Sequence, residues 1–378
     1  MKKKILMISL NDIGSTVSLG VTKKIIGQYK AFQKIGYETY NLCLDEGKGV
    51  MFYGNEKIVL FPKQVKTYVA YIKLFGMTKK ICKEKNIDVC YIRYPLADWV
   101  FCRMIKQLHN YCKIIVEIPT FPYDIETKNQ TNIVTKFNYW QDKRNRNKIK
   151  KYIDLVVNYG ECNQIYGIKA LKISNGIDIN SIKYIEIKNK NDNEINLITV
   201  ALMRKVHGYD RIITGLKNYY SKGTPEIIVK YHVVGNGDVL SDLKEMVKNE
   251  QLTEYVKFYG IQSGEALDQI FCHCDIGLTV LAGHREGLSK MSDLKSREYC
   301  ARGIPFVYAS EDDAFPKEEK FHMRVSQNDD PINIEQIVEF ALFVRQHDEI
   351  HKYMRKYAEK NLTWEIQMKK VMDTIKNL

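Results

Sequence analysis

Residues 290–307 read KMSDLKSREYCARGIPFV. The stretch combines the basic residues Lys290 and Lys295 with the acid Glu298, and a Gly303–Pro305 turn then leads into an apolar pair. A helix that only covered a sheet would not need these charges. The pattern therefore predicts a helix that starts around residues 290–293 and holds a charged ligand, followed by a buried strand.

Short apolar runs alternate with amphipathic stretches throughout the rest of the chain, which predicts strands and helices in turn. In the second half, strands are expected at residues 195–202, 226–235, 255–260, 275–281 and 304–309, and helices at 210–222, 240–252 and 265–274. In the first half, strands are expected at 4–10, 38–44, 88–94, 113–119, 154–159 and 170–174, and helices at 22–36, 69–86 and 99–111. This alternation predicts parallel sheets with helices on both faces.

Length and composition indicate two domains. The chain has 378 residues, of which 45% are hydrophobic, enough for two cores. Residues 179–195 are polar and rich in Asn and Lys, and they form the most linker-like part of the chain. Nowhere do about 20 uncharged apolar residues follow one another, so no bilayer-spanning segment is expected. The apolar run that follows the basic residues 2–4 is too short for a signal peptide.

The cysteines and the charge balance restrict the class of protein further. Nine cysteines, an odd number without framework spacing, indicate reduced thiols in a cytosolic protein. The formal net charge of +13 is compatible with nucleic acid, an anionic membrane or a phosphorylated substrate as partner. The basic residues are scattered over both halves without an RRM, KH or helix-turn-helix signature, which disfavours nucleic-acid binding. The GNGD motif at 235–238 lacks the third glycine of a dehydrogenase fingerprint.

Four motifs in order resemble the nucleotide-sugar domain of GT-B glycosyltransferases, in particular the retaining, family-4-like bacterial enzymes. They are ISNGID at 173–178, VALMRKVHGYDRII at 200–213, YHVVGNGD at 231–238 and LKSREYCARGIPFV at 294–307. In the first half, GVTKKI at 20–25 and EIPTFPYDIE at 117–126 resemble loops of enzymes that build capsules and surface polysaccharides. Four motifs in the family's order are hard to obtain by chance.

The resemblance implies an α/β protein of the GT-B fold, with two Rossmann-like domains that face a central cleft. Its expected parts are an acceptor-binding domain at 1–180, a nucleotide-sugar domain at 195–360 and a helix at 361–378 that crosses back to the first domain. The implied activity is a retaining, metal-independent hexosyltransferase without a cofactor. It would move a sugar from a UDP- or GDP-sugar to a saccharide or lipid-linked acceptor in the synthesis of bacterial cell-surface polysaccharide. The alternatives are a GT-B-fold epimerase or phosphorylase.

The resemblance also assigns donor-binding residues in the second half. Glu298 is implied to accept hydrogen bonds from the ribose hydroxyls, a charge-assisted contact. Lys290, Ser292 and Lys295 are implied to face the diphosphate, where the two lysines act as catalytic residues by stabilising charge on the leaving group. Further donor-binding residues are expected at Arg204, Lys205, His207, Asn236, Arg285 and Leu294. Taken alone, the 290–307 stretch would also fit a helix with solvated charges and a tight turn.

The sequence departs from the family's pattern around this site. Lys290 stands where many family-4 enzymes carry a glutamate eight positions before Glu298. Leu202 and His207 stand where the family usually has Arg and Lys. The missing charge would come from Arg204, Lys205 or Arg285. For His207, a polar residue that packs locally at a helix start is an equally good interpretation.

Glycines of two loops are expected to bring the backbone close to the donor. Gly20, in the loop after the first strand, would offer backbone amides to the sugar or phosphate. Lys23 and Lys24 follow, and cations at a helix start weakly favour an anionic ligand. Gly235 and Gly237 would let the backbone approach the nucleotide, or else form an ordinary tight turn.

The acceptor site is expected in the first half, on the loop after the strand at 113–119. Its acceptor-binding residues would be Glu117, Thr120 and Tyr123. Asp124 is the first candidate for the catalytic base and Glu126 the second, because a carboxylate there could orient or deprotonate an acceptor hydroxyl. Either acid could equally belong to a helix start.

Basic residues interleaved with aromatic ones point to a membrane surface. Residues 66–85 and 138–152 have this composition, the latter with Tyr139 and Trp140 at its edge. Such helices suit contact with the inner face of the plasma membrane, where a lipid-linked acceptor would be presented to a cytoplasmic enzyme. A core-facing helix with a solvated basic face fits the pattern equally well.

Overall fold

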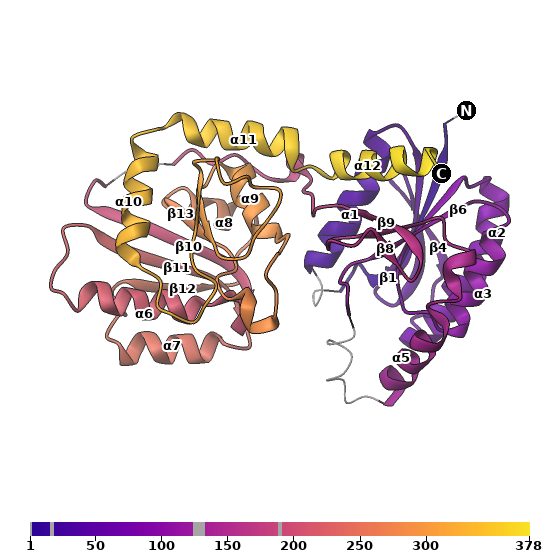
Figure 1. The fold of residues 1–378 in the computed structure, drawn as a ribbon, viewed down its shortest axis with the longest axis horizontal. Coiled ribbons are helices and arrows are strands. Elements are labelled where there is room, and N and C mark those ends of the chain that lie inside the picture. The colour runs from indigo at the N-terminus through magenta and orange to yellow at the C-terminus, as the bar shows by residue number, and fades with distance from the viewer. Residues whose placement is uncertain (1, 16–18, 124–132, 188–190) are drawn as a thin grey trace. The chain divides into compact units, whose positions relative to one another are not determined.

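The computed structural model describes residues 2–15, 19–123, 133–187 and 191–378. The chain divides into two compact units (Figure 1). The first comprises Met1–Gly176 and Trp364–Leu378, and the second comprises Ile177–Thr363. From the sequence, divisions are expected at residues 180, 195 and 360.

The first unit contains a sheet with the strand order β4-β3-β2-β1-β5-β6-β7-β9-β8. The strands are β1 (Lys4–Asp12), β2 (Glu38–Asp45), β3 (Lys48–Tyr53), β4 (Glu56–Phe61), β5 (Val89–Arg93), β6 (Lys113–Ile118), β7 (Leu155–Asn158), β8 (Gln164–Ile165) and β9 (Ile168–Lys172). From β2 to β9 in this order, neighbouring strands are parallel, as the strand–helix alternation predicts. The antiparallel strands β3, β4 and β8 extend the sheet at its edges and were not predicted.

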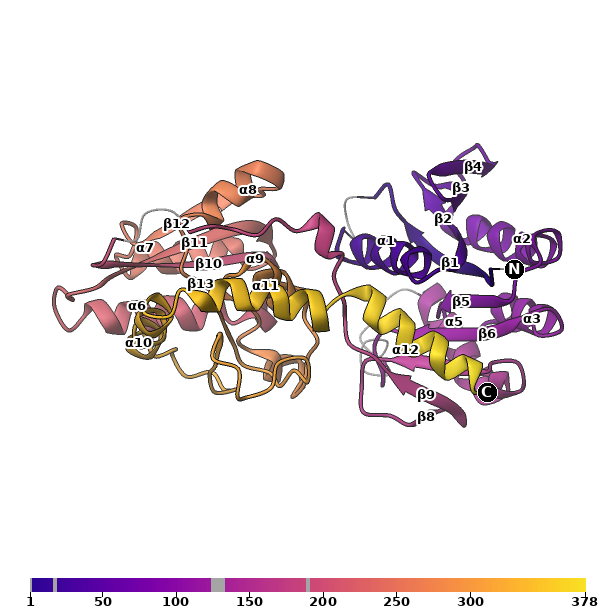
Figure 2. The same ribbon diagram turned by 90° about the horizontal axis from the view of Figure 1, so that it is seen from above.

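Helices cover both faces of this sheet (Figure 2). They are α1 (Leu19–Lys34), α2 (Thr67–Lys85), α3 (Trp99–Leu108), α5 (Ile133–Asn145) and α12 (Trp364–Lys376), with a short 3-10 helix η2 (Ile149–Lys151). Side chains of β1 alternate between the two faces, as expected for a strand buried on both sides. Ile5 and Met7 share a core with α1 and α12, whereas Leu6 and Ile8 share a core with α2 and α3.

Helix α12 is the last helix of the chain and packs on α1. Its Trp364 is buried against Gly27, where a Cβ atom would lie only 2.4 Å from the indole ring. Glycine is therefore needed at this position for the two helices to approach so closely. Lys34 of α1 and Glu365 of α12 form an ion pair with an N–O distance of 2.6 Å at the edge of this contact.

The second unit contains a parallel sheet with the strand order β12-β11-β10-β13-β14-β15. The strands are β10 (Glu194–Met203), β11 (Ile228–Gly237), β12 (Val256–Gly260), β13 (Ile276–Leu278), β14 (Phe306–Tyr308) and β15 (His322–Arg324). One face is covered by α6 (Tyr209–Tyr220), α7 (Leu240–Asn249) and α10 (Ile334–Arg345), and the other by α8 (Gly264–Phe271), α9 (Leu294–Arg302) and α11 (Glu349–Asn361). Three 3-10 helices complete the unit, namely η3 (Ile179–Ser181), η4 (Lys205–His207) and η5 (Gly283–Glu286). Strand β15 and helices α10 and α11 were not predicted.

The helix within the 290–307 stretch begins at Leu294, one residue after the expected range of 290–293. Asp293 is its N-cap, and the carboxylate accepts a hydrogen bond from the backbone N–H of Ser296 at 3.1 Å. Lys290 is not part of the helix, because it forms an isolated parallel bridge with Glu311. The helix ends at Gly303, whose φ of 77° is the left-handed conformation that glycine adopts readily.

Candidate functional site

The carboxyl ends of β10 and β13 carry two loops that are joined to each other. The backbone N–H of Leu281 donates to the carbonyl of His207 at 3.0 Å, and that of Ala282 donates to Val206 at 3.1 Å. Gly208 has a φ of 67°, and a Cβ atom there would lie 2.8 Å from the Cβ of Ala282, so this contact requires glycine. Ligands of open parallel sheets bind at this edge.

His207 connects these loops to helix α9. Its Nδ1 accepts a hydrogen bond from the backbone N–H of Arg204 at 3.0 Å, which assigns the proton of the neutral ring to Nε2. Nε2 lies 3.0 Å from Nζ of Lys295. A protonated lysine is also only a donor, so two donors face each other unless Lys295 gives up its proton. An anionic oxygen beside them would accept hydrogen bonds from both.

The protonation of both side chains is disfavoured in this environment. Burial lowers the pKa of His207 to about 3, and the charges of Lys295 and Arg204 add to this effect. Burial also lowers the pKa of Lys295, against the opposing charges of Asp293 and Glu298. In both cases the charge of Arg204 lowers the pKa further, so an anion bound beside these groups would stabilise the protonated lysine.

Two further predicted residues lie beside this pair. Glu298 is partly buried and lies one helical turn after Lys295 on α9, close enough for its charge to act on the lysine. The side chain of Arg204 is exposed, and its guanidinium makes an ion pair with Glu286 at 3.4 Å. Exposed pairs of this kind contribute little stability, so Arg204 can turn toward a ligand at little cost. The structure thus brings together Arg204, His207, Lys295 and Glu298.

Arg285, by contrast, is engaged within the protein. Its two terminal nitrogens contact the carboxylate of Asp210 at 2.9 and 2.7 Å, and its Nε donates to Asp329 at 2.7 Å. A further hydrogen bond of 2.9 Å goes to the carbonyl of Lys205. These contacts raise the pKa of Arg285 and fix the η4 and η5 loops to each other. The geometry argues against the predicted contact of Arg285 with the diphosphate. It favours a role for Arg285 in positioning the η4 and η5 loops.

The predicted phosphate site at the start of α9 also needs revision. The carboxylate of Asp293 already accepts from the amide of Ser296, which places a negative charge at the helix start. Lys290 lies 3.6 Å from Asp313, with both side chains about half exposed. The remaining predicted donor residues of this unit, apart from the two glycines, are exposed or partly buried, namely Lys205, Asn236, Ser292 and Leu294.

Gly235 and Gly237 form the end of β11, in register with Ala201 and Met203 of β10. Their φ angles are 125° and 150°. A Cβ atom would lie 1.9 Å from the carbonyl oxygen of Ala201 at the first position and 2.2 Å from that of Met203 at the second. The neighbouring strand therefore requires both glycines, and neither position is the ordinary tight turn considered as the alternative.

The carboxyl edge of the first sheet holds a buried charge cluster around Glu117. This carboxylate is 1% exposed. It accepts hydrogen bonds from five side chains, namely Lys24 at 2.8 Å, Gln28 at 2.8 Å, Tyr91 at 2.7 Å, Tyr159 at 3.1 Å and Arg93 at 3.3 Å. Burial acts to raise the pKa of Glu117, but the charges of Lys24 and Arg93 outweigh it and lower the pKa to about 2. Because its oxygens are fully occupied, the predicted acceptor role of Glu117 is not supported by this geometry.

The other predicted residues of the first unit differ in accessibility. Tyr123 is buried, and its hydroxyl donates to Asp142 at 2.7 Å. Thr120 is exposed, and so is Gly20, which lies in the first turn of α1 instead of in a loop. The candidate bases Asp124 and Glu126 lie outside the described residues.

The sequence does not predict the contacts of two buried charged side chains, Arg297 and Asp142. Arg297 of α9 is fully buried and contacts both oxygens of Asp312 at 2.6 and 2.8 Å, which ties α9 to the loop after β14. Asp142 of α5 is also fully buried and accepts from the backbone N–H of Ala97 at 2.8 Å. Only Asp142 could have been noticed in the sequence, because it is the single acidic residue within the basic run 138–152.

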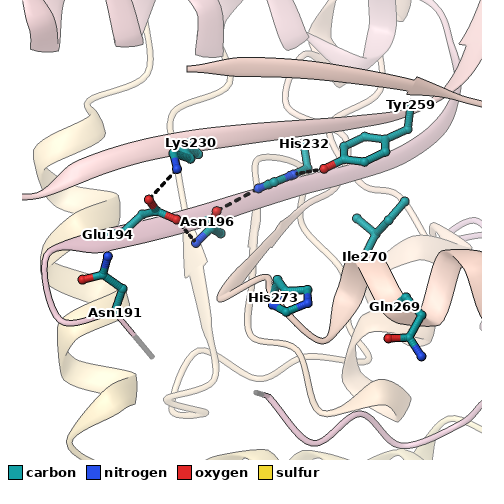
Figure 3. A pocket seen from close by; sticks show the side chains of 9 residues that line it. All are labelled: Asn191, Glu194, Asn196, Lys230, His232, Tyr259, Gln269, Ile270 and His273. Atoms are coloured by element: carbon teal, nitrogen blue, oxygen red, sulfur yellow. Dashed lines mark hydrogen bonds and ion pairs between the residues drawn. The ribbon is translucent and has the colours of Figure 1, made fainter. Parts of the chain in front are cut away.

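A hollow of about 470 Å³ lies elsewhere in the second unit, toward the amino ends of β10 and β11 (Figure 3). His232 at its centre contacts Tyr259 at 2.7 Å and Asn196 at 2.8 Å, and Lys230 pairs with Glu194 at 2.6 Å. Burial lowers the pKa of His232 to about 4, so the ring is neutral. Because these polar groups satisfy one another at the edge opposite to that of His207, we do not assign the donor to this hollow.

The same part of the second unit matches a known family. Residues 180–319 match the family model described as "Glycosyl transferases group 1". None of the curated proteins matches the chain in sequence.

Solved structures resemble the whole chain at low sequence identity. A glycosyltransferase from Rickettsia africae has 13% identity and a TM-score of 0.64, with 100% of this chain and 98% of that chain covered. Sucrose-phosphate synthase from Thermosynechococcus elongatus has 13% identity and a TM-score of 0.65, with 99% of both chains covered. The pneumococcal O-GlcNAc transferase, solved with UDP and GlcNAc, has 12% identity and a TM-score of 0.60, with 100% and 99% covered.

These likenesses confirm the predicted fold class. The α/β architecture with two sheets matches that of GT-B glycosyltransferase structures. The residues brought together around His207 and Lys295 fall within the matched segment. The chain therefore has the GT-B fold, and its residues 180–319 match the model of the glycosyl transferases group 1 family.

Proposed function

We propose that this protein is a retaining, metal-independent glycosyltransferase that uses a nucleotide-sugar donor. The observation that carries the proposal is the contact between His207 and Lys295 at the carboxyl edge of the second sheet, where two N–H donors face one position. A diphosphate oxygen at that position accepts from both, and Arg204 adds a second positive charge beside that of Lys295. Glu298, one turn farther along α9, then binds the ribose hydroxyls.

The proposed reaction needs positive charge at the leaving group. The bond between the anomeric carbon and the diphosphate oxygen breaks, and a bond from the acceptor oxygen forms on the same face of the sugar. The departing diphosphate takes the acceptor's proton. Lys295 and Arg204 stabilise the negative charge that develops on the diphosphate, a role that a divalent metal fills in other enzymes.

The test is donor turnover by the full chain across UDP-, GDP- and dTDP-sugars, with and without a chelator. Glu298→Ala is expected to abolish turnover, because the ribose contact positions the donor. Glu339→Ala is the matched control, since Glu339 is an exposed glutamate on another helix of the same unit. Near-normal turnover by Glu298→Ala would refute the site. Conversion of the donor sugar to an epimer would favour the epimerase instead.

We further propose that the acceptor is a lipid-linked saccharide of cell-surface polysaccharide synthesis, met at an anionic membrane. Phe137 and Trp140 of α5 are 56% and 54% exposed, and their rings stack at 5.8 Å. Lys143 and Arg144 lie next to them over aromatic rings. Exposed aromatic and basic side chains on one helix suit the interface of an anionic bilayer. In the described part of the chain, every helix is too short or too polar to cross a bilayer.

This surface can be tested separately from catalysis. The double variant Phe137→Ala, Trp140→Ala is expected to lose binding to vesicles that contain anionic lipid and to keep donor hydrolysis. Tyr353→Ala, an exposed aromatic residue of the second unit, should bind vesicles like the unaltered protein. Equal vesicle binding by all three proteins would refute the proposed membrane surface.

A further inference from the structure

Three cysteines from separate parts of the first unit converge on one point. Cys82 lies near the end of α2, Cys90 lies in β5, and Cys112 directly precedes β6. The sulfur of Cys90 is 3.5 Å from that of Cys82 and 3.4 Å from that of Cys112, and all three sulfurs lie within 4.8 Å of one another. Figure 2 shows α2 near β5 and β6; α2 and β5 carry Cys82 and Cys90, and β6 directly follows Cys112. The irregular spacing of these three cysteines along the chain does not predict that they lie together.

We propose that Cys82, Cys90 and Cys112 bind a thiophilic metal ion of the Zn²⁺ or Cu⁺ class through three thiolates. Thiolate ligands select these ions. With metal–sulfur distances of about 2.3 Å, three sulfurs around one ion lie about 3.8–4.0 Å apart. The two short sulfur separations are within a few tenths of an ångström of this range, so small side-chain rotations complete the site.

The surroundings suit an ion that enters from one side. Cys82 and Cys90 are buried, whereas Cys112 is partly exposed and leaves a path to solvent. Within the described ranges, no fourth His, Cys, Asp or Glu ligand atom belongs to the group. A water molecule at the Cys112 side would supply a fourth ligand to Zn²⁺, whereas Cu⁺ would need none.

The charge around the opening also fits a metal–thiolate group. Three thiolates and a Zn²⁺ or Cu⁺ ion carry a net negative charge, which requires nearby cations. The ammonium of Lys83 lies 4.9 Å from the centre of the Tyr111 ring, and that of Lys79 lies 6.0 Å from it. Tyr111 directly precedes Cys112 and Lys83 directly follows Cys82, so these cations belong to segments that carry two of the three cysteines.

The group is separate from the proposed glycosyltransferase chemistry. Cys112 precedes the first residue of β6, whereas Glu117 lies near the carboxyl end of that strand. At about 3.3 Å per residue, the strand places about 16 Å between them. The bound ion would tie the end of α2 to the starts of β5 and β6, which stabilises the first unit.

The experiment uses the full-length protein, reduced and freed of metal, with all nine thiols verified by titration. Cd²⁺ serves as the first probe, because thiolate binding gives it an ultraviolet charge-transfer absorption, and Zn²⁺ and Cu⁺ are titrated in separate arms. One equivalent per chain is expected, together with a rise in the unfolding temperature of the first unit. Cys90→Ser and Cys112→Ser should each weaken binding more than about 100-fold, beyond the usual effect of an outer-shell change. Cys112→Ser tests the site even if the buried Cys90→Ser variant fails to fold.

Cys102→Ser is the matched control, because Cys102 is a partly exposed cysteine of the same unit whose sulfur contacts a backbone carbonyl instead of another thiol. It should bind the probes like the unaltered protein. The proposal is overturned if the reduced protein binds no stoichiometric Cd²⁺, Zn²⁺ or Cu⁺. It is also overturned if Cys112→Ser binds as tightly as the Cys102→Ser control.

Discussion

The carboxyl edges of the two sheets use charged residues in opposite ways. In the first unit, the buried carboxylate of Glu117 is matched by Lys24 and Arg93 and by three neutral hydrogen-bond donors. In the second unit, the partly buried Lys295 faces the Nε2–H of His207, and neither group accepts from the other while the lysine is protonated.

This difference separates a structural cluster from a binding site. A buried charge that is fully paired within the protein leaves nothing for a ligand to contact. Two N–H donors that face each other have no acceptor between them, and a bound anion supplies that acceptor. We therefore propose that the Glu117 cluster serves stability and that the His207–Lys295 pair serves anion binding.

The largest expected effect is on the stability of the first unit. Glu117→Gln removes the negative charge and leaves Lys24 and Arg93 without their partner. The loss should be about 3–5 kcal/mol, as when one member of a buried ion pair is removed. Tryptophan fluorescence in a urea titration measures this selectively, because Trp99, Trp140 and Trp364 all belong to the first unit.

The control for this substitution is Glu84→Gln, at an exposed glutamate of α2. Its surface pair with Lys80 contributes little, so the fluorescence transition should stay within about 0.5 kcal/mol of the unaltered protein. A Glu117→Gln variant that unfolds like this control would show that the cluster is not structural, and the comparison between the two edges would fail.

The second effect concerns activity. Lys295→Met is expected to lower kcat by about 10²–10³-fold, the usual consequence of removing one group that stabilises developing negative charge. The second unit should keep its stability, because burial already disfavours the charged lysine. Lys356→Met, at an exposed lysine of α11 in the same unit, is the control and should retain most of the activity. If Lys295→Met lost stability together with activity, Lys295 would contribute to the stability of the fold, as Glu117 does.

The sequence was sufficient for most of the fold and for part of this site. Strand–helix alternation located the parallel strands because each one is a continuous apolar run buried on both faces. It missed β3 and β4, although both contain short apolar runs, because these antiparallel strands follow β2 without intervening helices and so fall outside the alternation. Sequence motifs located His207, Lys295 and Glu298, but they could not show that Arg285 is paired with Asp210, because that contact joins separate loops.

A third, smaller effect is the pH dependence of nucleotide binding. Since His207 has a pKa of about 3, it stays neutral from mildly acidic to alkaline pH, and Lys295 is the group of the pair that changes its charge. A diphosphate favours protonated Lys295 and raises its pKa in the complex. Affinity should therefore be full below the lowered pKa of the free lysine and fall as pH rises through it, by at most about tenfold per pH unit.

Calorimetric titration with the tightest-binding nucleoside diphosphate, at a series of pH values, measures this dependence. In Lys295→Met the same fall should be absent. If both proteins show the same pH profile, the titrating group is not Lys295, and the facing donors do not form the anion site.

The smallest expected effect tests whether Arg285 only forms ion pairs within the protein, as Glu117 does, or also contacts the ligand. Arg285→Lys keeps a cation but loses the two-pronged contact with Asp210. Because the pair is partly exposed, solvent screening limits the loss of stability to about 1 kcal/mol or less. If Arg285 only holds the η4 and η5 loops, kcat should fall less than tenfold while KM for the donor rises slightly, since His207 shifts relative to Lys295. A fall in kcat as large as that of Lys295→Met would instead mean that the guanidinium leaves Asp210 to contact the diphosphate, and that a residue paired within the protein can still be part of the binding site.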